Sequence, residues 1–258
     1  MKQVIINADD FGWDEETTDL TIELLEKGLL TSATIMTDRP SSEKAIDYAK
    51  QHGKSFSFGL HFNLVDHHIP CSDTPSSLID ESGKLKMSNH QRKDALLWKL
   101  NAKEIQKEFE CQLTQLLDAG VEVSHIDSHG HLHKFPQIVM AIKPVMKKYG
   151  IRTIRIPQNV FPSDSKKKIV INNLFRLFFF GMVTTDHFYM LENHEDENWI
   201  DNFFSKLPEG LTELGVHPGR TDHWRDIETQ PFLDGSMANA LRHNGIELVN
   251  FHTIGRVS

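Results

Sequence analysis

The chain has 258 residues, of which 39% are hydrophobic and 25% are charged, so it suits either one large α/β barrel or two small domains. The formal net charge of -8 argues against a nucleic-acid binder, which would carry a basic face. It leaves a small neutral or anionic ligand open.

The cysteines and the apolar segments bear on the compartment. Cys71 and Cys111 have no metal-type spacing and are too few for a disulfide framework, so we expect free thiols in a reducing compartment. The start of the chain, MKQVIINADD, is too short for a signal peptide. The most apolar run, 174–183, is about half a membrane span and contains Arg176, so we expect a buried or interface helix there. These features predict a cytoplasmic protein that does not enter a membrane.

Short β-rich segments alternate with helical patterns along most of the chain. The predicted strands are 4–6, 31–36, 55–61, 121–126, 153–156, 210–216 and 246–249. The predicted helices are 14–25, 41–51, 102–117, a segment from Pro136 to a stop at Gly150, 198–205 and 232–242. Such alternation predicts an α/β fold whose parallel sheet closes, or nearly closes, into a barrel.

A doubly wound open sheet is the competing fold, but no Gly-rich phosphate loop follows the first strand. Two stretches break the rhythm, near 65–100 and 161–199. We interpret them as insertions over one face of a single domain that spans 1–258.

Ionisable residues gather where the predicted strands end, which is where parallel α/β folds place their working groups. The segment NADDFG at 7–12 follows the first strand and presents Asp9 and Asp10. Side chains alternate along a strand, so one carboxylate can bind a metal while the other faces a bound water. A solvated turn or a helix N-cap is the structural alternative.

The third and fourth strands end in histidines. In SFSFGLH at 55–61 the small residues share one face with His61, which suits a crowded barrel interior; a core histidine is the alternative. The segment HIDSHGHLH at 125–133 places His125, Asp127, His129 and His131 at every second position. Histidine is the commonest metal ligand, and Asp127 can orient one by a hydrogen bond. A polar loop is the alternative there, and the pattern alone does not say which histidine binds.

Later strand ends add further groups. Arg155 can hold a carboxylate or polarise a carbonyl, unless it makes a surface salt bridge. The segment 185–188 is expected to line the mouth, and His217 stands where a general acid is useful. Two histidines and one carboxylate make a catalytic type of metal site with open positions.

With these motifs the sequence resembles the YdjC family of carbohydrate deacetylases. The resemblance lies in NADDFG at 7–12, GLHFNL at 59–64, HIDSHGHLH at 125–133 and HPG at 217–219, in the same order. It implies an irregular seven-stranded β/α barrel, removal of an N-acetyl group from an amino sugar or chitooligosaccharide, and a homodimer. It also implies one divalent metal, Mg²⁺ or Zn²⁺, on Asp10, His61 and His125, with Asp9 as the base.

The expected roles follow from this set. Asp9 takes the proton of a metal-bound water, and His217 protonates the leaving amine, with His129 or His131 as alternatives. Arg155, Asp127, His129 and His131 are predicted to contact the substrate. Two other functions stay open: a phosphoesterase with a second metal, and a non-catalytic sugar- or metal-binding regulator.

Overall fold

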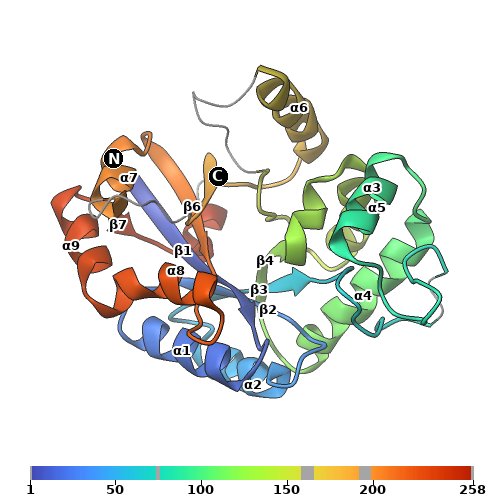
Figure 1. The fold of residues 1–258 in the computed structure, drawn as a ribbon, viewed down its shortest axis with the longest axis horizontal. Coiled ribbons are helices and arrows are strands. Elements are labelled where there is room, and N and C mark those ends of the chain that lie inside the picture. Colours follow the sequence, from blue (N-terminus) through green and yellow to red (C-terminus); the bar gives the residue numbers. More distant parts are fainter. Residues whose placement is uncertain (1, 74–75, 158–165, 192–198, 257–258) are drawn as a thin grey trace.

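The computed structural model describes residues 2–73, 76–157, 166–191 and 199–256, which form a parallel α/β barrel (Figure 1). Its seven strands are β1 (Lys2–Phe11), β2 (Ser32–Ile35), β3 (Ser57–Phe62), β4 (Val123–Ser128), β5 (His187–Met190), β6 (Gly210–Val216) and β7 (Glu247–Leu248). The strand order is β4-β3-β2-β1-β6-β5, and β7 pairs with β1. This confirms the predicted α/β barrel class.

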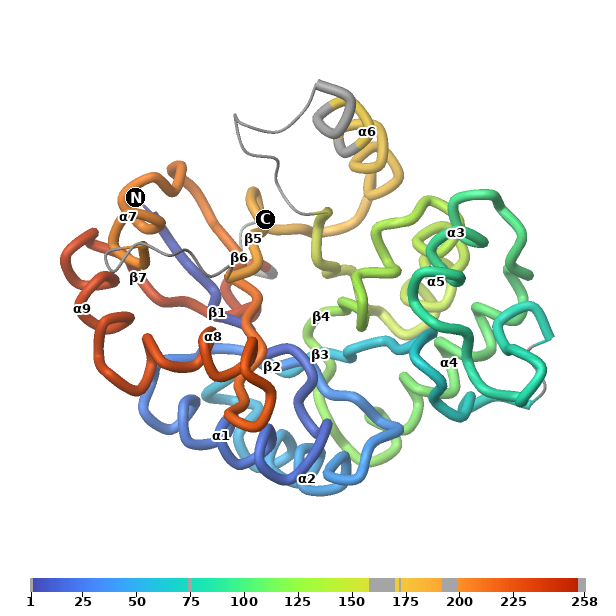
Figure 2. Tube along the Cα trace, in the orientation of Figure 1, coloured from blue at the N-terminus to red at the C-terminus, as the bar shows by residue number. Residues whose placement is uncertain are grey.

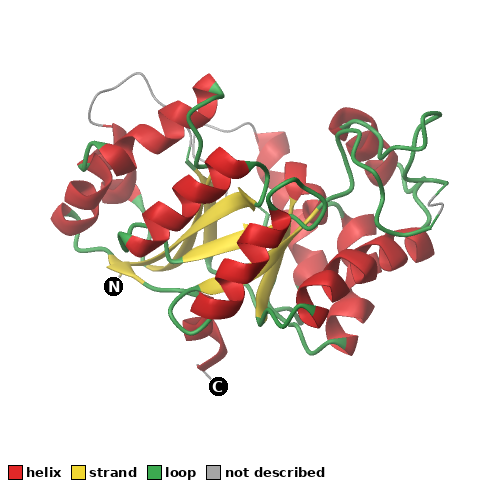
Figure 3. Cartoon of the chain, turned by 90° about the horizontal axis from the view of Figure 1, so that it is seen from below, coloured by secondary structure: helices red, strands yellow, loops and turns green. Residues whose placement is uncertain are grey.

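The helices surround the strands (Figure 3). They are α1 (Glu15–Glu26), α2 (Ser42–His52), α3 (Ser88–Leu96), α4 (Ala102–Asp118), α5 (Pro136–Lys148), α6 (Lys166–Arg176), α7 (Trp199–Lys206), α8 (His223–Leu233) and α9 (Ser236–His243). Short 3-10 helices are η1 (His129–Lys134), η2 (Leu177–Phe179) and η3 (Phe251–Arg256). The predicted helix 232–242 is in fact the end of α8 and all of α9, because Gly235 adopts a left-handed conformation with φ of 84° between them.

The strand β1 pairs with different strands along its length, and this curls the sheet. Its carboxyl half pairs with β2, whereas Gln3 and Val4 near its start pair with β7. At the far side of the sheet, Ile154 bridges to β4 and Thr153 bridges to Val183. The predicted strand 153–156 is therefore reduced to two isolated bridges that lead the sheet back toward β5.

β5 corrects the prediction that 161–199 is an insertion over one face. This four-residue strand pairs with β6 and belongs to the sheet. The sequence pattern did not reveal β5, because the strand has four residues and directly follows two polar residues, Thr185 and Asp186. The remainder of that predicted insertion includes 161–165 and 192–198, which lie outside the described residues.

The segment 65–100 folds back onto α4, and this overturns the prediction of free thiols. Cys71 and Cys111 form a disulfide, with their Cα atoms 5.9 Å apart. The buried carboxylate of Glu108, one turn before Cys111, accepts hydrogen bonds from the Cys71 and Ser72 backbone N–H groups at 2.8 Å each. Sequence spacing could not reveal the pair, because only the return of the loop to α4 brings the two residues together.

The apolar run 174–183 divides at η2. Phe179 is buried, whereas Leu174, Leu177 and Phe180 are exposed, Phe180 to 92%. Figure 2 shows α6 standing away from the barrel, and the exposed apolar side chains lie on and directly after this helix. In the described part of the chain, no helix combines the length and the apolar character that a membrane crossing needs.

Candidate metal centre and active site

Side chains at the carboxyl end of the sheet form two layers inside the barrel. Residue pairing sets His61 of β3 beside Asp127 of β4. Two residues lower, Gly59 lies against His125: a Cβ on this glycine would come within 2.6 Å of the His125 carbonyl oxygen and 2.7 Å of its ring. Only glycine therefore leaves room for the His125 ring at that depth.

Asp10 owes its position to an irregular strand. Simple alternation would turn it away from Asp9, but Asp10 adopts φ of 60° where the pairing of β1 with β2 shifts register. A non-glycine residue in this left-handed region is strained, and such strain concentrates at functional sites. The irregularity brings both carboxylates, each 1% exposed, to the mouth of the barrel.

Asp10, His61 and His129 form a group with metal-ligand spacing. The Asp10 Oδ1 atom is 3.1 Å from His61 Nε2 and 2.8 Å from His129 Nδ1. The three ligand atoms all lie within 4.8 Å of one another. Two nitrogens and one carboxylate oxygen match a catalytic metal site, which keeps open positions for water and substrate.

The opposite ring nitrogens of both histidines face carboxylates. His61 Nδ1 is 2.7 Å from Asp127 Oδ1, and His129 Nε2 is 3.5 Å from Asp66 Oδ2. Such partners fix the ring orientation and the tautomer that exposes the other nitrogen to a metal. Asp127 is thus buried and orients His61, and its predicted contact with the substrate stays a prediction.

A second group, Asp9, His61 and Asp127, has similar spacing, but a guanidinium already occupies it. Arg155 is completely buried and binds both oxygens of Asp9 at 2.7 Å. It also lies 2.8 Å from Asp127 and donates to Glu213 at 2.7 Å. Arg155 therefore orients Asp9, and its predicted contact with the substrate stays a prediction.

His125 does not join the predicted ligand trio. Its Nε2 lies 3.3 Å from Asn7 Oδ1, and its ring stacks on Phe251 with centroids 3.6 Å apart. Because His61 pairs with Asp127, the residue two places earlier in β4 lies one layer deeper, roughly 6–7 Å along the strand. His129, immediately after β4, takes the position beside Asp10.

Buried carboxylates outnumber buried guanidinium groups at this site. Four buried carboxylates, Asp9, Asp10, Asp127 and Glu213, face two buried guanidinium groups, Arg155 and Arg225. Burial lowers the pKa of His61, but Asp127 and Asp10 raise it to about 10. Burial likewise lowers the pKa of His129, but Asp10 and Asp66 raise it to about 9.

In the metal-free protein, protons on His61 and His129 therefore balance part of the negative charge. A divalent cation would take over this role and release those protons, since metal ligation requires neutral imidazole. The residues present thus fit a divalent metal in donor type and in the sign of their charge.

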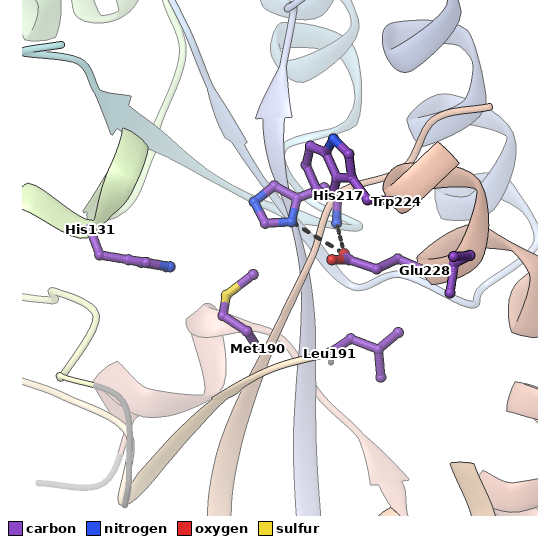
Figure 4. Close-up of a pocket in the computed structure, with 7 residues that line it drawn as sticks. His131, Met190, Leu191, His217, Trp224 and Glu228 are labelled. Atoms are coloured by element: carbon purple, nitrogen blue, oxygen red, sulfur yellow. Dashed lines mark hydrogen bonds and ion pairs between the residues drawn. The ribbon is translucent and has the colours of Figure 1, made fainter. Parts of the chain in front are cut away.

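A pocket of ≈ 270 Å³ opens beside this group (Figure 4). Its lining comprises His131, Met190, Leu191, His217, Trp224, Ile227 and Glu228. His131 points toward the opening from η1, while His217, Trp224 and Glu228 stand on the other side. His131 Nδ1 is buried without a hydrogen-bond partner among the described residues, and burial lowers the pKa of its ring well below the usual range. His131 is thus a neutral group at the pocket wall, where the sequence predicted a substrate contact.

His217 faces Asp9 across the edge of this pocket. Its Nε2 is 4.0 Å from Asp9 Oδ2, and its Nδ1 is 3.2 Å from Glu228 Oε2. Burial raises the pKa of Asp9, but Arg155 holds it well below its usual range, so Asp9 is ionised. An ionised carboxylate that can accept a proton thus lies close to an oriented imidazole that can donate one.

Comparison with known proteins identifies the family. The family model described as YdjC-like protein matches residues 3–243. The chain belongs to the YdjC-like protein family.

Its relatives and one solved structure extend over nearly the whole chain. A carbohydrate deacetylase of Geobacillus stearothermophilus is 30% identical, with 96% of each chain covered. One of Brevibacillus brevis is 30% identical over 98% of this chain and all of its own. The crystal structure of a putative cellobiose-phosphate cleavage protein from Enterococcus faecalis superposes with a TM-score of 0.81 at 22% identity, covering 98% of both chains. At this identity, the structural likeness establishes the shared fold.

Sequence reasoning missed Arg225 and Glu228, both on α8. Arg225 is buried and donates from Nη2 to the metal-group carboxylate of Asp10 at 2.6 Å. Its stem passes over Gly219, where a Cβ would lie 2.7 Å from Arg225 Cδ. The glycine of the family's HPG motif was therefore the available signal that a side chain crosses this turn, although it does not say which one.

Proposed function

We propose that the protein is a metal-dependent hydrolase that removes the N-acetyl group from an amino sugar or chitooligosaccharide and releases acetate. The observation that carries this proposal is that Asp9 and His217 face each other, 4.0 Å apart, beside the Asp10–His61–His129 group. The names of its full-length relatives, carbohydrate deacetylases, support the same reaction.

In this proposal Asp10, His61 and His129 hold one divalent ion. When bound, the ion lowers the pKa of a water and polarises the acetamide carbonyl. Asp9, fixed by Arg155, accepts the proton of the attacking water. His217 donates a proton from Nε2 to the leaving nitrogen, while Glu228 holds its Nδ1.

The pocket supports an acetylated sugar as the substrate. Met190, Leu191 and Ile227 give it an apolar wall that accepts the acetyl methyl group and excludes water. Trp224 offers an aromatic face for a sugar ring. His131 lines the same pocket and offers a neutral imidazole ring to the substrate.

The ligand chemistry bears on the metal. Two imidazoles and one carboxylate favour Zn²⁺, Co²⁺ or Ni²⁺, whereas Mg²⁺ prefers oxygen ligands and retained waters. We propose Zn²⁺ as the stronger binder of the two predicted ions. Reconstitution of metal-free protein with each ion, followed by affinity and activity measurements, tests the choice.

The two other functions fit the geometry less well. A phosphoesterase with two metals needs a second cation position, and Arg155 fills the neighbouring group. A non-catalytic binder has no need of an oriented base and acid, yet Arg155 and Glu228 orient both. These contacts support the deacetylase over either alternative.

The direct test is to incubate metal-loaded protein with N,N'-diacetylchitobiose and measure acetate. We expect stoichiometric acetate and free amine, no acetate after chelation, and a rate of release about 10²- to 10⁴-fold lower from Asp9→Asn. Absence of acetate from this sugar and from other N-acetylated sugars would overturn the proposal, and hydrolysis of a phosphate ester in its place would favour the phosphoesterase.

We also propose that the chain forms a homodimer through exposed apolar side chains of α6, η2 and the residue after η2, namely Leu174, Leu177 and Phe180. Such a patch on a protein surface commonly marks an interaction site. Light scattering tests this: Leu177→Glu should give monomers where the natural protein gives dimers, and a monomeric natural protein contradicts the proposal. The cytoplasmic location stays a prediction.

A further inference from the structure

The side chain of Arg225 is held over the turn that precedes α8. The helix is tied to this turn because Thr229 Oγ1 accepts a hydrogen bond from the Gly219 N–H at 3.0 Å and donates one to the Gly219 carbonyl oxygen at 2.9 Å. The Arg225 stem crosses Gly219, where a Cβ would come within 2.7 Å of Arg225 Cδ. Arg225 is buried between these elements, so its stem has little freedom to move.

The guanidinium at the end of this stem is fixed as well. It lies 4.5 Å from the centre of the Trp224 ring and 5.6 Å from that of Trp13, within range of a cation–π interaction. Its Nε is 3.5 Å from the exposed carboxylate of Asp222. Its Nη2 makes a shorter contact, a hydrogen bond of 2.6 Å to Asp10 Oδ2. Within the described part of the chain, Nε and Nη1 have no hydrogen-bond partner, so the hydrogen bonding of Arg225 is directed at Asp10.

The two oxygens of Asp10 therefore have different partners. Oδ1 is 3.1 Å from His61 Nε2 and 2.8 Å from His129 Nδ1, the other two atoms of the metal group. Oδ2 accepts the hydrogen bond from Arg225 instead. The left-handed backbone of Asp10, with φ of 60°, sets the carboxylate between the histidines and the guanidinium. Of the two oxygens, Oδ1 thus belongs to the metal group.

The number of carboxylate oxygens that bind an ion affects which ion a site prefers. Zn²⁺ takes four or five ligands, and two imidazoles, one carboxylate oxygen and a water supply four. Ions that prefer six or more ligands, such as Mn²⁺ and Ca²⁺, gain from a carboxylate that binds through both oxygens. The second oxygen of Asp10 can reach an ion only by giving up its hydrogen bond to Arg225, and such charge-assisted bonds are strong.

We propose that Arg225 is a positioning residue that limits Asp10 to one metal-binding oxygen and thereby favours Zn²⁺ over ions of higher coordination number. This inference rests on the metal site of the proposed function. It adds a residue outside the ligand group that determines which metal the group holds.

The ratio of two metal affinities separates this role from a purely electrostatic or structural one. Loss of the positive charge of Arg225 would strengthen the binding of Zn²⁺ and Mn²⁺ alike, since both ions carry the same charge. Loss of its packing against Trp224 and Gly219 would weaken both alike. A change in the number of Asp10 oxygens at the ion moves the two affinities by different amounts.

The test compares two arginines that flank the same turn. Arg225→Met removes the guanidinium and keeps an apolar stem beside Gly219. Arg220→Met is the matched control, because Arg220 is exposed. Competition with a chromogenic chelator, below the unfolding temperature of each variant, gives the Zn²⁺ and Mn²⁺ affinities.

We expect Arg225→Met to lower the ratio of Zn²⁺ to Mn²⁺ affinity about tenfold, because no hydrogen bond then opposes binding through both oxygens. Arg220→Met should keep the ratio of the natural protein. A crystal structure of the Zn²⁺-loaded natural protein tests the same point if Arg225→Met does not fold. Asp10 Oδ1 should lie about 2.0–2.2 Å from the ion, while Oδ2 stays on Arg225 Nη2.

An unchanged ratio in Arg225→Met would overturn the inference, as would both Asp10 oxygens within about 2.6 Å of the ion in the natural protein. Acetate assays separate this result from the proposed function. Acetate release together with an unchanged ratio removes only the role of Arg225. A ratio that falls in Arg225→Met, while the natural protein releases no acetate from any sugar, removes only the deacetylase.

Discussion

Two groups of possible metal ligands share His61, and they differ in which cation balances the negative charge of their carboxylates. In the Asp10–His61–His129 group, imidazoles and carboxylates meet with no described cationic side chain between them except Arg225 at one edge. In the Asp9–His61–Asp127 group, the Arg155 guanidinium contacts both carboxylates at 2.7–2.8 Å. The first group can hold a cation, and the second already contains one.

The difference explains how adjacent aspartates acquire separate roles. Both are buried to the same extent, so burial does not distinguish them. Arg155 keeps Asp9 ionised, oriented and available to a proton, whereas Asp10 turns through its left-handed backbone toward the histidines. In the proposed function, the side-chain cation in the second group therefore leaves the first group to hold the single metal ion.

The two groups should differ most in the effects of Asp10→Asn and Asp9→Asn on metal binding and acetate release. Asp10→Asn should lose both metal and acetate release, because it removes the only carboxylate of the ligand group. Asp9→Asn should keep one metal per chain yet lower the rate of acetate release about 10²- to 10⁴-fold. Metal analysis of the purified variants checks this, with Asp47→Asn, a change to an exposed carboxylate on α2, as control. Loss of metal from Asp9→Asn would assign Asp9 to the metal.

Replacing the guanidinium should have the next largest effect. Arg155→Met leaves three carboxylates buried without their partner, and we expect a loss of about 3–5 kcal/mol in the free energy of unfolding. Urea denaturation measures it, with the exposed Arg152→Met as the matched control. Divalent metal should restore part of the loss by entering the vacated position. An unchanged stability would mean that the network around Arg155 contributes nothing.

Much of the site could be read from the sequence, and the missing parts are those that depend on tertiary register. Strand ends followed by Asp or His gave Asp9, Asp10, His61 and His217, because one edge of a parallel sheet gathers them. The depth of His125 depends on how β3 and β4 align, which no local pattern encodes. Arg225 comes from a helix with an internal proline that periodicity did not reveal.

The metal affinities of variants at two histidines of the same segment test which of them is a ligand. His129→Gln should weaken metal binding by more than about 100-fold, because it removes a ligand where loss of a mere supporting partner costs 10- to 100-fold. His125→Gln should bind metal as the natural protein does, since its ring contacts Asn7 and Phe251 instead. Competition with a chromogenic chelator, below the unfolding temperature of each variant, gives both affinities. The reverse order would restore His125 to the ligand trio.

The smallest effect concerns Glu213, the third carboxylate on Arg155. Burial raises its pKa to about 7, and repulsion from Asp127 and Asp9 adds to this while Arg155 opposes it. The folded protein therefore holds this proton more tightly than the unfolded chain, whose glutamate has a pKa near 4.5. Stability is present in full below pH 4.5 and falls as the pH rises through about 7.

Glu213→Gln removes that slope without removing the hydrogen-bond acceptor of Arg155 Nε. Between pH 5 and pH 7, the natural protein should lose on the order of 2 kcal/mol relative to the variant in the free energy of unfolding. Urea denaturation of the metal-free proteins at both pH values gives this difference directly. Parallel pH profiles would show that Glu213 is already ionised at pH 5, and that Arg155 alone balances three negative charges in the group that excludes the metal.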